Sequence, residues 1–181
     1  MAYILKGTEL KLLIELMKNS RRSDRELAKA IGSSQPTVSR MIRKLEKEGY
    51  IKEYTIIPDF SKLGFEVMSI ILTKLKQELP PGSLEELRKK VREDEKKNPS
   101  SILMGMTGMG NDSDRVLILL SEDYSAYSKY MGLVKQHPLV DVEEVKSFIV
   151  NLSEKGQFLP LSLLSLARYL EKKQNTLRMQ S

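Results

Sequence analysis

The chain has 181 residues, which is enough for one large or two small domains with a buried core. It has no cysteine, which excludes disulfides, thiolate nucleophiles and cysteine-based metal sites, and no apolar stretch is long enough to predict a membrane span. Its net charge is +6, and residues 1–60 hold 12 Lys or Arg against 8 Asp or Glu. We therefore expect a cytoplasmic protein whose first third meets an anionic partner.

Two helices are predicted at the start of the chain. Leucines at helical spacing predict the first from about Thr8 to Lys18, with Thr8 as its cap. The second is predicted over Asp24–Ile31, where Ser23 and Glu26 have the spacing of a capping box. A glycine-containing turn follows it.

A basic helix is predicted from Ser34 to Glu48. Ser34 is a suitable N-cap, Pro36 is tolerated in the first turn, and Gly49 can end the helix in a left-handed conformation. No acidic residue lies between Leu27 and Leu45, so this part of the chain is expected to carry a positive field. Such a field favours contact with the phosphates of a nucleic acid.

The order helix, short helix, turn, basic helix is that of a helix-turn-helix, in which the basic helix reads the major groove. The side chains expected to meet bases are polar or basic: Gln35, Thr37, Ser39 and Arg40. Those expected to meet phosphates are Arg43, Lys44, Lys52, Arg21 and Arg22. Ser34 and Pro36, at the start of the helix, complete the predicted DNA-binding set. The alternative for this basic face is an ordinary solvated surface.

A strand is predicted over Tyr50–Ile57, because this segment is rich in Tyr, Ile and Thr and ends at a proline. Directly after a recognition helix, such a strand would be a wing. Residues 58–64 then have the composition of a linker.

The second half of the chain alternates strand and helix patterns. The predicted elements are strands at 65–75, 101–108, 116–121 and 140–152, and helices at 83–97 and 123–136. The order βαββαβ predicts a ferredoxin-like sandwich, whose second sheet face would favour dimer formation if it is apolar. A last, leucine-rich helix is predicted over 158–170, with its stripe at Leu159, Leu163, Leu166 and Leu170, and with a frayed tail from Gln174.

The predicted fold class is thus α+β. The domains are a winged helix-turn-helix at 1–57, a linker at 58–64, a ferredoxin-like dimerisation and effector domain at 65–152, and a C-terminal leucine-rich helix and tail at 153–181.

The segment from Ser34 to Ile51 resembles the recognition helix of the Lrp/AsnC (leucine-responsive, or feast/famine) family of transcriptional regulators. The resemblance lies in Ser-Gln-Pro-Thr-Val-Ser-Arg at the helix start and in Leu-Glu, two residues, then Gly-Tyr-Ile from Leu45. With the sandwich that follows, it extends over about residues 8–152. It implies a dimer, or a higher oligomer, that binds double-stranded DNA.

The resemblance also implies that the loop between the second and third strands helps to bind a small effector, commonly an amino acid. The candidate residues are Gly108, Gly110, Asp112 and Asp114. The loop from Gly108 to Arg115 is expected to be longer than in the family, with Met109, Asn111 and Asp112 added. An ordinary turn is the alternative, and the sequence leaves open whether an effector binds.

No catalytic motif, metal cluster or phosphate-binding glycine loop is found, so neither an enzyme nor a cofactor is predicted. The single histidine, His137, is expected to be a cap or surface residue. The predicted function is sequence-specific transcriptional regulation. The alternatives are a DNA-coating chromatin protein, which would show little preference between sequences, and a winged-helix module that binds proteins.

Overall fold

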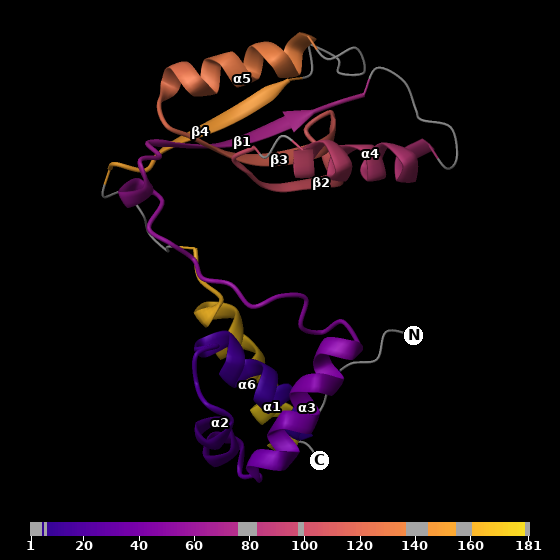
Figure 1. Cartoon of the computed structure of the whole chain (residues 1–181), viewed down its shortest axis with the longest axis vertical. Helices are drawn as coiled ribbons and strands as arrows, with labels where there is room; N and C mark the ends of the chain where they lie inside the picture. Colours follow the sequence, from indigo (N-terminus) through magenta and orange to yellow (C-terminus); the bar gives the residue numbers. More distant parts are fainter. Residues whose placement is uncertain are drawn as a thin grey trace. The chain divides into compact units, whose positions relative to one another are not determined.

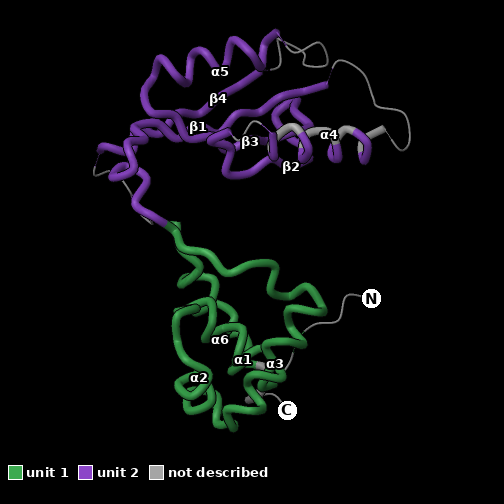
Figure 2. The backbone as a smooth tube through the Cα atoms, in the orientation of Figure 1, with its two compact units in different colours: residues 1–57, 158–181 green, residues 58–157 purple. Residues whose placement is uncertain are grey.

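The computed structural model describes residue 5 and residues 7–75, 83–97, 100–136, 145–154 and 161–179. The chain forms two compact units (Figure 2). The first unit combines residues 1–57 with residues 158–181, and the second is made of residues 58–157. Both ends of the chain therefore belong to the same unit.

The first unit contains α1 (Gly7–Lys18), α2 (Asp24–Ile31) and α3 (Gln35–Lys47), in the order predicted for a helix-turn-helix (Figure 1). The capping box of α2 is confirmed: the Ser23 N–H donates to Glu26 Oε2 at 2.8 Å, and the Glu26 N–H donates to Ser23 Oγ at 3.3 Å. The predicted Thr8 cap is wrong, because α1 already begins at Gly7 and Thr8 lies inside it.

A shared apolar core holds these three helices together. Its buried members are Leu5, Leu12, Leu16, Leu27, Ala28, Ile31, Val38 and Leu45. Burying one such large side chain contributes about 1.5–3 kcal/mol, so the core fixes how α3 is rotated against α1 and α2. Tyr50 and Ile51 pack against the same core after α3 ends.

The strand predicted over Tyr50–Ile57 is wrong, since residues 51–57 are described and form neither helix nor strand. The side chain of Ile56 is 77% exposed. An extended segment becomes a strand only when a second strand satisfies its backbone N–H and C=O groups, and the described residues of this unit contain no strand. The β-prone composition of the segment is therefore not sufficient to form a wing strand.

The second unit confirms the βαββαβ order of the ferredoxin-like prediction. After a short 3₁₀ turn, Ser61–Leu63, its elements are β1 (Val67–Thr73), α4 (Ser83–Lys97), β2 (Ile102–Gly110), β3 (Ser113–Ser121), α5 (Tyr124–Gln136) and β4 (Lys146–Asn151). The strand order is β2-β3-β1-β4, and all three strand pairs are antiparallel. Residues 140–144 of the predicted fourth strand lie outside the described residues, as does His137.

The connection between β2 and β3 is shorter than predicted. The strands extend to Gly110 and from Ser113, so that only Asn111 and Asp112 form the turn. Their φ angles of 50° and 54° are those of a type I′ turn, whose twist matches that of the flanking strands. The expected long loop from Gly108 to Arg115 is therefore wrong, because its residues are paired in the hairpin instead.

The two faces of the sheet differ in composition. On one face Val67, Ile71 and Leu119 pack with Tyr127 and Met131 of α5. Strand register places ten apolar side chains on the opposite face: Met68, Ile70, Leu72, Met104, Met106, Val116, Ile118, Leu120, Phe148 and Val150. In the described part of the chain, the helix that contacts the sheet is α5, on the first face.

The C-terminal helix, α6 (Leu164–Met179), packs against α1 in the first unit. Its predicted leucine stripe is wrong: Leu163 and Leu166 are exposed and Leu170 is half-buried, whereas Ala167 and Gln174 are the buried positions among the described side chains of α6. The partner surface of α1 includes polar groups, because Lys18 pairs with Glu171 and the Gly7 carbonyl accepts from Gln174. The predicted fraying from Gln174 is also wrong, because α6 continues to Met179; Leu159 lies outside the described residues.

Candidate nucleic-acid interface

The start of α3 is fixed by local hydrogen bonds. Ser34 Oγ accepts from the Thr37 N–H at 3.4 Å and lies 2.8 Å from Thr37 Oγ1. Val38 and Leu45, both fully buried, fix the helix rotation from the other side. A capped helix with one anchored face presents its remaining face rigidly, and the positive end of its dipole adds to the field there.

The face that α3 turns to solvent carries Gln35, Pro36, Arg40 and Arg43. Arg40 Nη2 donates to Thr37 Oγ1 at 3.4 Å, and Arg43 Nε donates to the Ser39 carbonyl at 3.2 Å. Each of these contacts uses one of several guanidinium N–H donors and orients the side chain. The remaining donors have the fork geometry that matches a guanine edge or a phosphate.

Two predicted contact residues of α3 interact with acids from other helices. The Ser39 hydroxyl donates to Asp24 of α2, and Lys44 Nζ forms an ion pair with Glu9 of α1 at 2.6 Å. No acidic residue lies between Leu27 and Leu45 in the sequence, but the fold brings Glu9 and Asp24 to this segment, so its positive field is partly neutralised. Sequence reasoning missed both acids because each lies far along the chain from its partner, with no local signal to find it.

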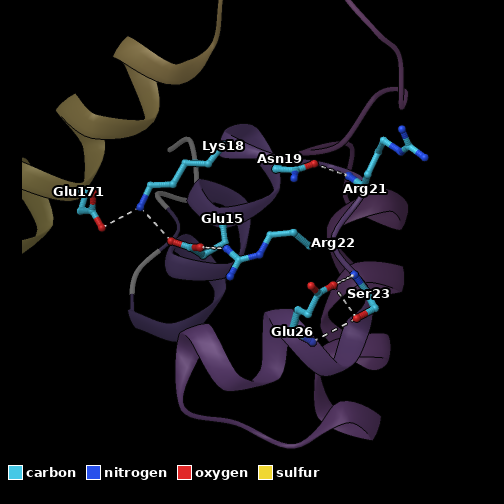
Figure 3. A network of polar contacts seen from close by, with 8 residues as sticks. All are labelled: Glu15, Lys18, Asn19, Arg21, Arg22, Ser23, Glu26 and Glu171. Carbon is cyan, nitrogen blue, oxygen red and sulfur yellow. Dashed lines mark hydrogen bonds and ion pairs between the residues drawn. The ribbon is translucent and has the colours of Figure 1, made fainter.

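The predicted phosphate contacts outside α3 also differ in their surroundings. Arg21 and Lys52 are exposed. Arg22 instead donates through Nη1 to the carboxylate of Glu15, whose other oxygen accepts from Lys18 (Figure 3). An arginine held by a partly buried carboxylate is less available to a phosphate than one exposed to solvent.

The segment after α3 is anchored by a tyrosine that sequence reasoning missed. The Tyr54 hydroxyl donates to Glu46 Oε1 at 3.1 Å. Burial and this hydrogen bond to a carboxylate raise the pKa of Tyr54 to about 12. The contact lies next to Lys52 and limits how far that lysine can move from the end of α3.

The predicted effector residues lie at the tip of the β2–β3 hairpin. Gly110, Asp112 and Asp114 line a hollow of about 500 Å³ together with Lys74 and Leu75. Gly108 and Gly110 line a second hollow of about 190 Å³.

The two aspartates that line the larger hollow, Asp112 and Asp114, have partners. Asp114 Oδ1 accepts from Arg115 at 2.8 Å, and Asp114 Oδ2 accepts from the Leu75 N–H at 3.4 Å. Lys146 Nζ donates to the Asn111 carbonyl at 2.7 Å and lies 3.9 Å from Asp112. Both charge signs are therefore present around this hollow.

Other kinds of site find no support in the described residues. Among them, no group of three or more His, Asp or Glu side chains could hold a metal ion. In the same part of the chain, no helix is both long and apolar enough to cross a membrane.

Comparison with known proteins gives one family match and several similar chains. The family described as winged helix-turn-helix DNA-binding matches residues 5–52. The transcriptional regulator LrpC of Bacillus subtilis is 43% identical over 68 residues, which are 38% of this chain and 47% of that relative. The chain thus spans about half the length of this relative, and about half the length of three relatives from Pyrococcus species.

Two further comparisons extend over most of the chain. The transcriptional regulator Ptr1 of Methanocaldococcus jannaschii is 26% identical over 159 residues, covering 87% of this chain and 100% of the relative. A solved transcriptional regulator from Neisseria meningitidis, in complex with L-Met, has a TM-score of 0.67 at 21% identity, covering 87% of this chain and 97% of that one. At that identity the likeness supports the fold.

Proposed function

The chain belongs to the Lrp/AsnC family of transcriptional regulators, and we propose on that basis that it binds double-stranded DNA in a sequence-specific manner through α3. The observation that carries the proposal is the rigid exposed face of α3, with Arg40 and Arg43 oriented by their own helix. In this proposal the protein is not an enzyme. Its proposed place of action is the cytoplasm.

The proposed roles follow from what each side chain contacts. Gln35 and Arg40 meet base edges from the first turns of α3, with Thr37 supporting Arg40. Arg43, Lys52 and Arg21 meet phosphates. Ser39, Lys44 and Arg22 are assigned instead to holding the helices together, because carboxylates already accept from them.

A substitution pair tests this assignment. In Arg40→Ala/Arg43→Ala the loss of two exposed side chains should leave the fold intact, because surface substitutions change stability by about 0.5 kcal/mol or less. Removing the Arg40 base contact alone should cost about 1–3 kcal/mol of discrimination between operator and random duplex. Competition binding at a fixed salt concentration measures it.

The control for this pair is Arg168→Ala/Lys173→Ala, which removes the same charge from exposed positions of α6. Equal operator affinity of the two double variants would contradict the proposal. A wild-type ratio near one between operator and random duplex would instead favour a DNA-coating chromatin protein. Binding that does not depend on salt, or no binding at all, would favour a protein-interaction module.

The apolar sheet face supports dimer formation. Met104, Met106 and Phe148 are exposed on this face and most of its other apolar side chains are partly exposed, which is typical of an interaction surface; the same face of a second copy is apolar as well. Phe148, 67% exposed in the single chain, is proposed to lie in this interface. A two-fold dimer would place its two α3 helices on half-sites about one helical turn of DNA, or a multiple, apart.

The dimer is tested with Phe148→Arg, which should produce a monomer in sedimentation because it places a charge in the apolar face. Tyr124→Arg, at an equally exposed position of α5, is the matched control and should remain a dimer. A Phe148→Arg protein that sediments as a dimer would exclude this face.

An amino-acid effector is proposed for the hollow at the β2–β3 hairpin. The similar fold from Neisseria meningitidis is a complex with L-Met, and here Asp112, Asp114 and Lys74 offer opposite charges to the two ends of a zwitterion. Amino acids, L-Met included, should raise the melting temperature of the second unit, because a ligand that binds only the folded state stabilises it. Asp112→Asn, which tolerates the same positive φ, should weaken that shift. No shift with any amino acid would contradict this role.

A further inference from the structure

The C-terminal helix covers the side of α1 that faces away from the helix-turn-helix core. Gly7, Ile14 and Lys18 recur on one face of α1 at helical spacing, and on α6 Ala167, Glu171 and Gln174 do the same. Gln174 Nε2 donates to the Gly7 carbonyl at 2.8 Å, and Lys18 Nζ donates to Glu171 Oε1 at 2.9 Å. Ala167 is fully buried, and its small side chain lets the two helices approach closely.

From Glu171 a chain of ion pairs leads to the loop between α1 and α2 (Figure 3). Lys18 Nζ also donates to Glu15 Oε1 at 2.9 Å, so the carboxylates of Glu15 and Glu171 share one ammonium group. The second oxygen of Glu15 accepts from Arg22 Nη1. The Glu15 side chain is only 16% exposed, which strengthens both contacts relative to a surface pair.

The charge states of these groups agree with the geometry. Hydrogen bonds to Glu15 and Glu171 raise the pKa of Lys18 above 10.5. Burial opposes ionisation of Glu15, but Lys18 and Arg22 outweigh it and hold the pKa of Glu15 below 4.5. Lys18 and Glu15 are therefore both charged near neutral pH.

The loop that this chain reaches is the one that carries Arg21. Asn19 Oδ1 accepts from the Arg21 N–H at 2.9 Å, which sets the backbone there, and Ser23 begins the capping box of α2. The Arg21 side chain extends away from the ion pairs in Figure 3. Arg22 thus ties the loop to Glu15 of α1, while the side chain of Arg21 points away from these ion pairs.

We propose that α6 is a brace of the DNA-binding unit, which positions the phosphate contact of Arg21 through Glu171, Lys18, Glu15 and Arg22. The inference rests on the proposed DNA binding and adds a positioning role for a helix far away in the sequence. Arg22 and Glu15 are positioning residues, and Arg21 is the group that touches DNA.

Release of α6 from α1 in the full chain tests the brace without DNA. Ala167→Glu puts a charge at a fully buried position and should expel α6, whereas Ser165→Glu adds the same charge at an exposed position of the same helix. Amide hydrogen exchange at residues 19–23 should become faster in Ala167→Glu and stay unchanged in Ser165→Glu. Equal exchange rates in the two variants, with α6 itself exchanging faster only in Ala167→Glu, would overturn the brace.

The DNA readout separates positioning from general stability. Ala167→Glu should bind operator several-fold more weakly than Ser165→Glu. The slope of log K against log salt for Ala167→Glu should also be shallower, by about 0.9 for each phosphate that this variant no longer neutralises. In an Arg21→Ala background the two variants should bind equally, because the side chain that the brace positions is already absent. An undiminished difference in that background would overturn the role of Arg21.

A milder pair covers the case in which Ala167→Glu does not fold. Lys18→Met removes the shared ammonium but keeps the aliphatic stem, and Lys173→Met makes the same change at an exposed position of α6. Faster loop exchange in Lys18→Met alone supports the brace, and equal exchange overturns it. If the wild type binds no DNA, the proposed function fails, while the exchange experiment still decides on the brace.

Discussion

Ile14 provides a quantitative test of how α6 packs on α1. Its side chain is 2% exposed, yet it lies on the face of α1 that carries Gly7 and Lys18. Leu12 and Leu16, which belong to the helix-turn-helix core, occupy the other face. On a helix-turn-helix without α6, Ile14 would face water, so its burial depends on the C-terminal helix.

The magnitude follows from that dependence. Replacing a buried Ile by Ala costs about 2–5 kcal/mol, whereas the same change at an exposed position costs about 0.5 kcal/mol or less. Ile14→Ala should therefore destabilise the first unit strongly in the wild-type background and weakly once Ala167→Glu has released α6. The coupling between the two substitutions should be about 2 kcal/mol, which exceeds the usual range for independent sites.

The assay must report on the first unit alone, because two units need not unfold together. Urea unfolding followed at the amide resonances of α3 meets this requirement. Val38→Ala is the control, since Val38 is fully buried in the helix-turn-helix core and should cost the same in both backgrounds. An equal cost of Ile14→Ala in both backgrounds would refute the packing of Ile14 under α6.

Two further predictions concern the β2–β3 hairpin and the loss of stability of the first unit at acidic pH. Asn111 has φ of 50°, so Asn111→Ala should destabilise the second unit by about 1 kcal/mol in urea unfolding while Asn111→Gly should not. Burial opposes ionisation of Glu15, but its partners lower its pKa in the folded state, so its stabilisation is present above pH 4.5 and is lost as the pH falls through the lowered value. Glu15→Gln should therefore flatten the acid side of the stability profile of the first unit; an unchanged profile would contradict this linkage.

Local signals predicted the helices of the first unit well. Ser23 with Glu26, and Ser34 followed by Pro36, are interactions within one helical turn, so the sequence contains both partners. The strand predicted over Tyr50–Ile57 failed for the opposite reason, because a strand needs a partner that its own composition does not supply.

Non-local partners explain what the sequence could not reveal about the candidate site. The ion pair of Lys44 with Glu9 joins residues from two helices, and no periodicity within α3 indicates it. In α6 the leucines have the spacing of a buried stripe, yet Ala167 and Gln174 are buried instead, on the face where Glu171 meets Lys18 and Gln174 meets the Gly7 carbonyl of α1. The face that a helix buries is decided by its partner as well as by its own pattern.

These contacts change how many phosphates each copy can neutralise. The sequence alone offers five basic side chains for phosphates, namely Arg21, Arg22, Arg43, Lys44 and Lys52. Since Arg22 and Lys44 are held by the carboxylates of Glu15 and Glu9, three are left for DNA. Each phosphate contact contributes about −0.9 to the slope of log K against log salt, so a dimer should show about −5, whereas all five contacts would give about −9.

Operator binding measured across a range of salt concentrations distinguishes the two values. The wild-type slope should steepen toward about −9 only if DNA displaces the carboxylates from Arg22 and Lys44, at the cost of leaving Glu15 and Glu9 unpaired beside the helices. If the carboxylates stay in place, Lys44→Met should leave the slope unchanged while it weakens the packing of α3 on α1. A wild-type slope near −9 that becomes shallower in Lys44→Met would mean that Lys44 leaves the carboxylate of Glu9 to bind a phosphate. The ion pair with Glu9 would then hold a DNA-binding side chain in the free protein, and its role would not be purely structural.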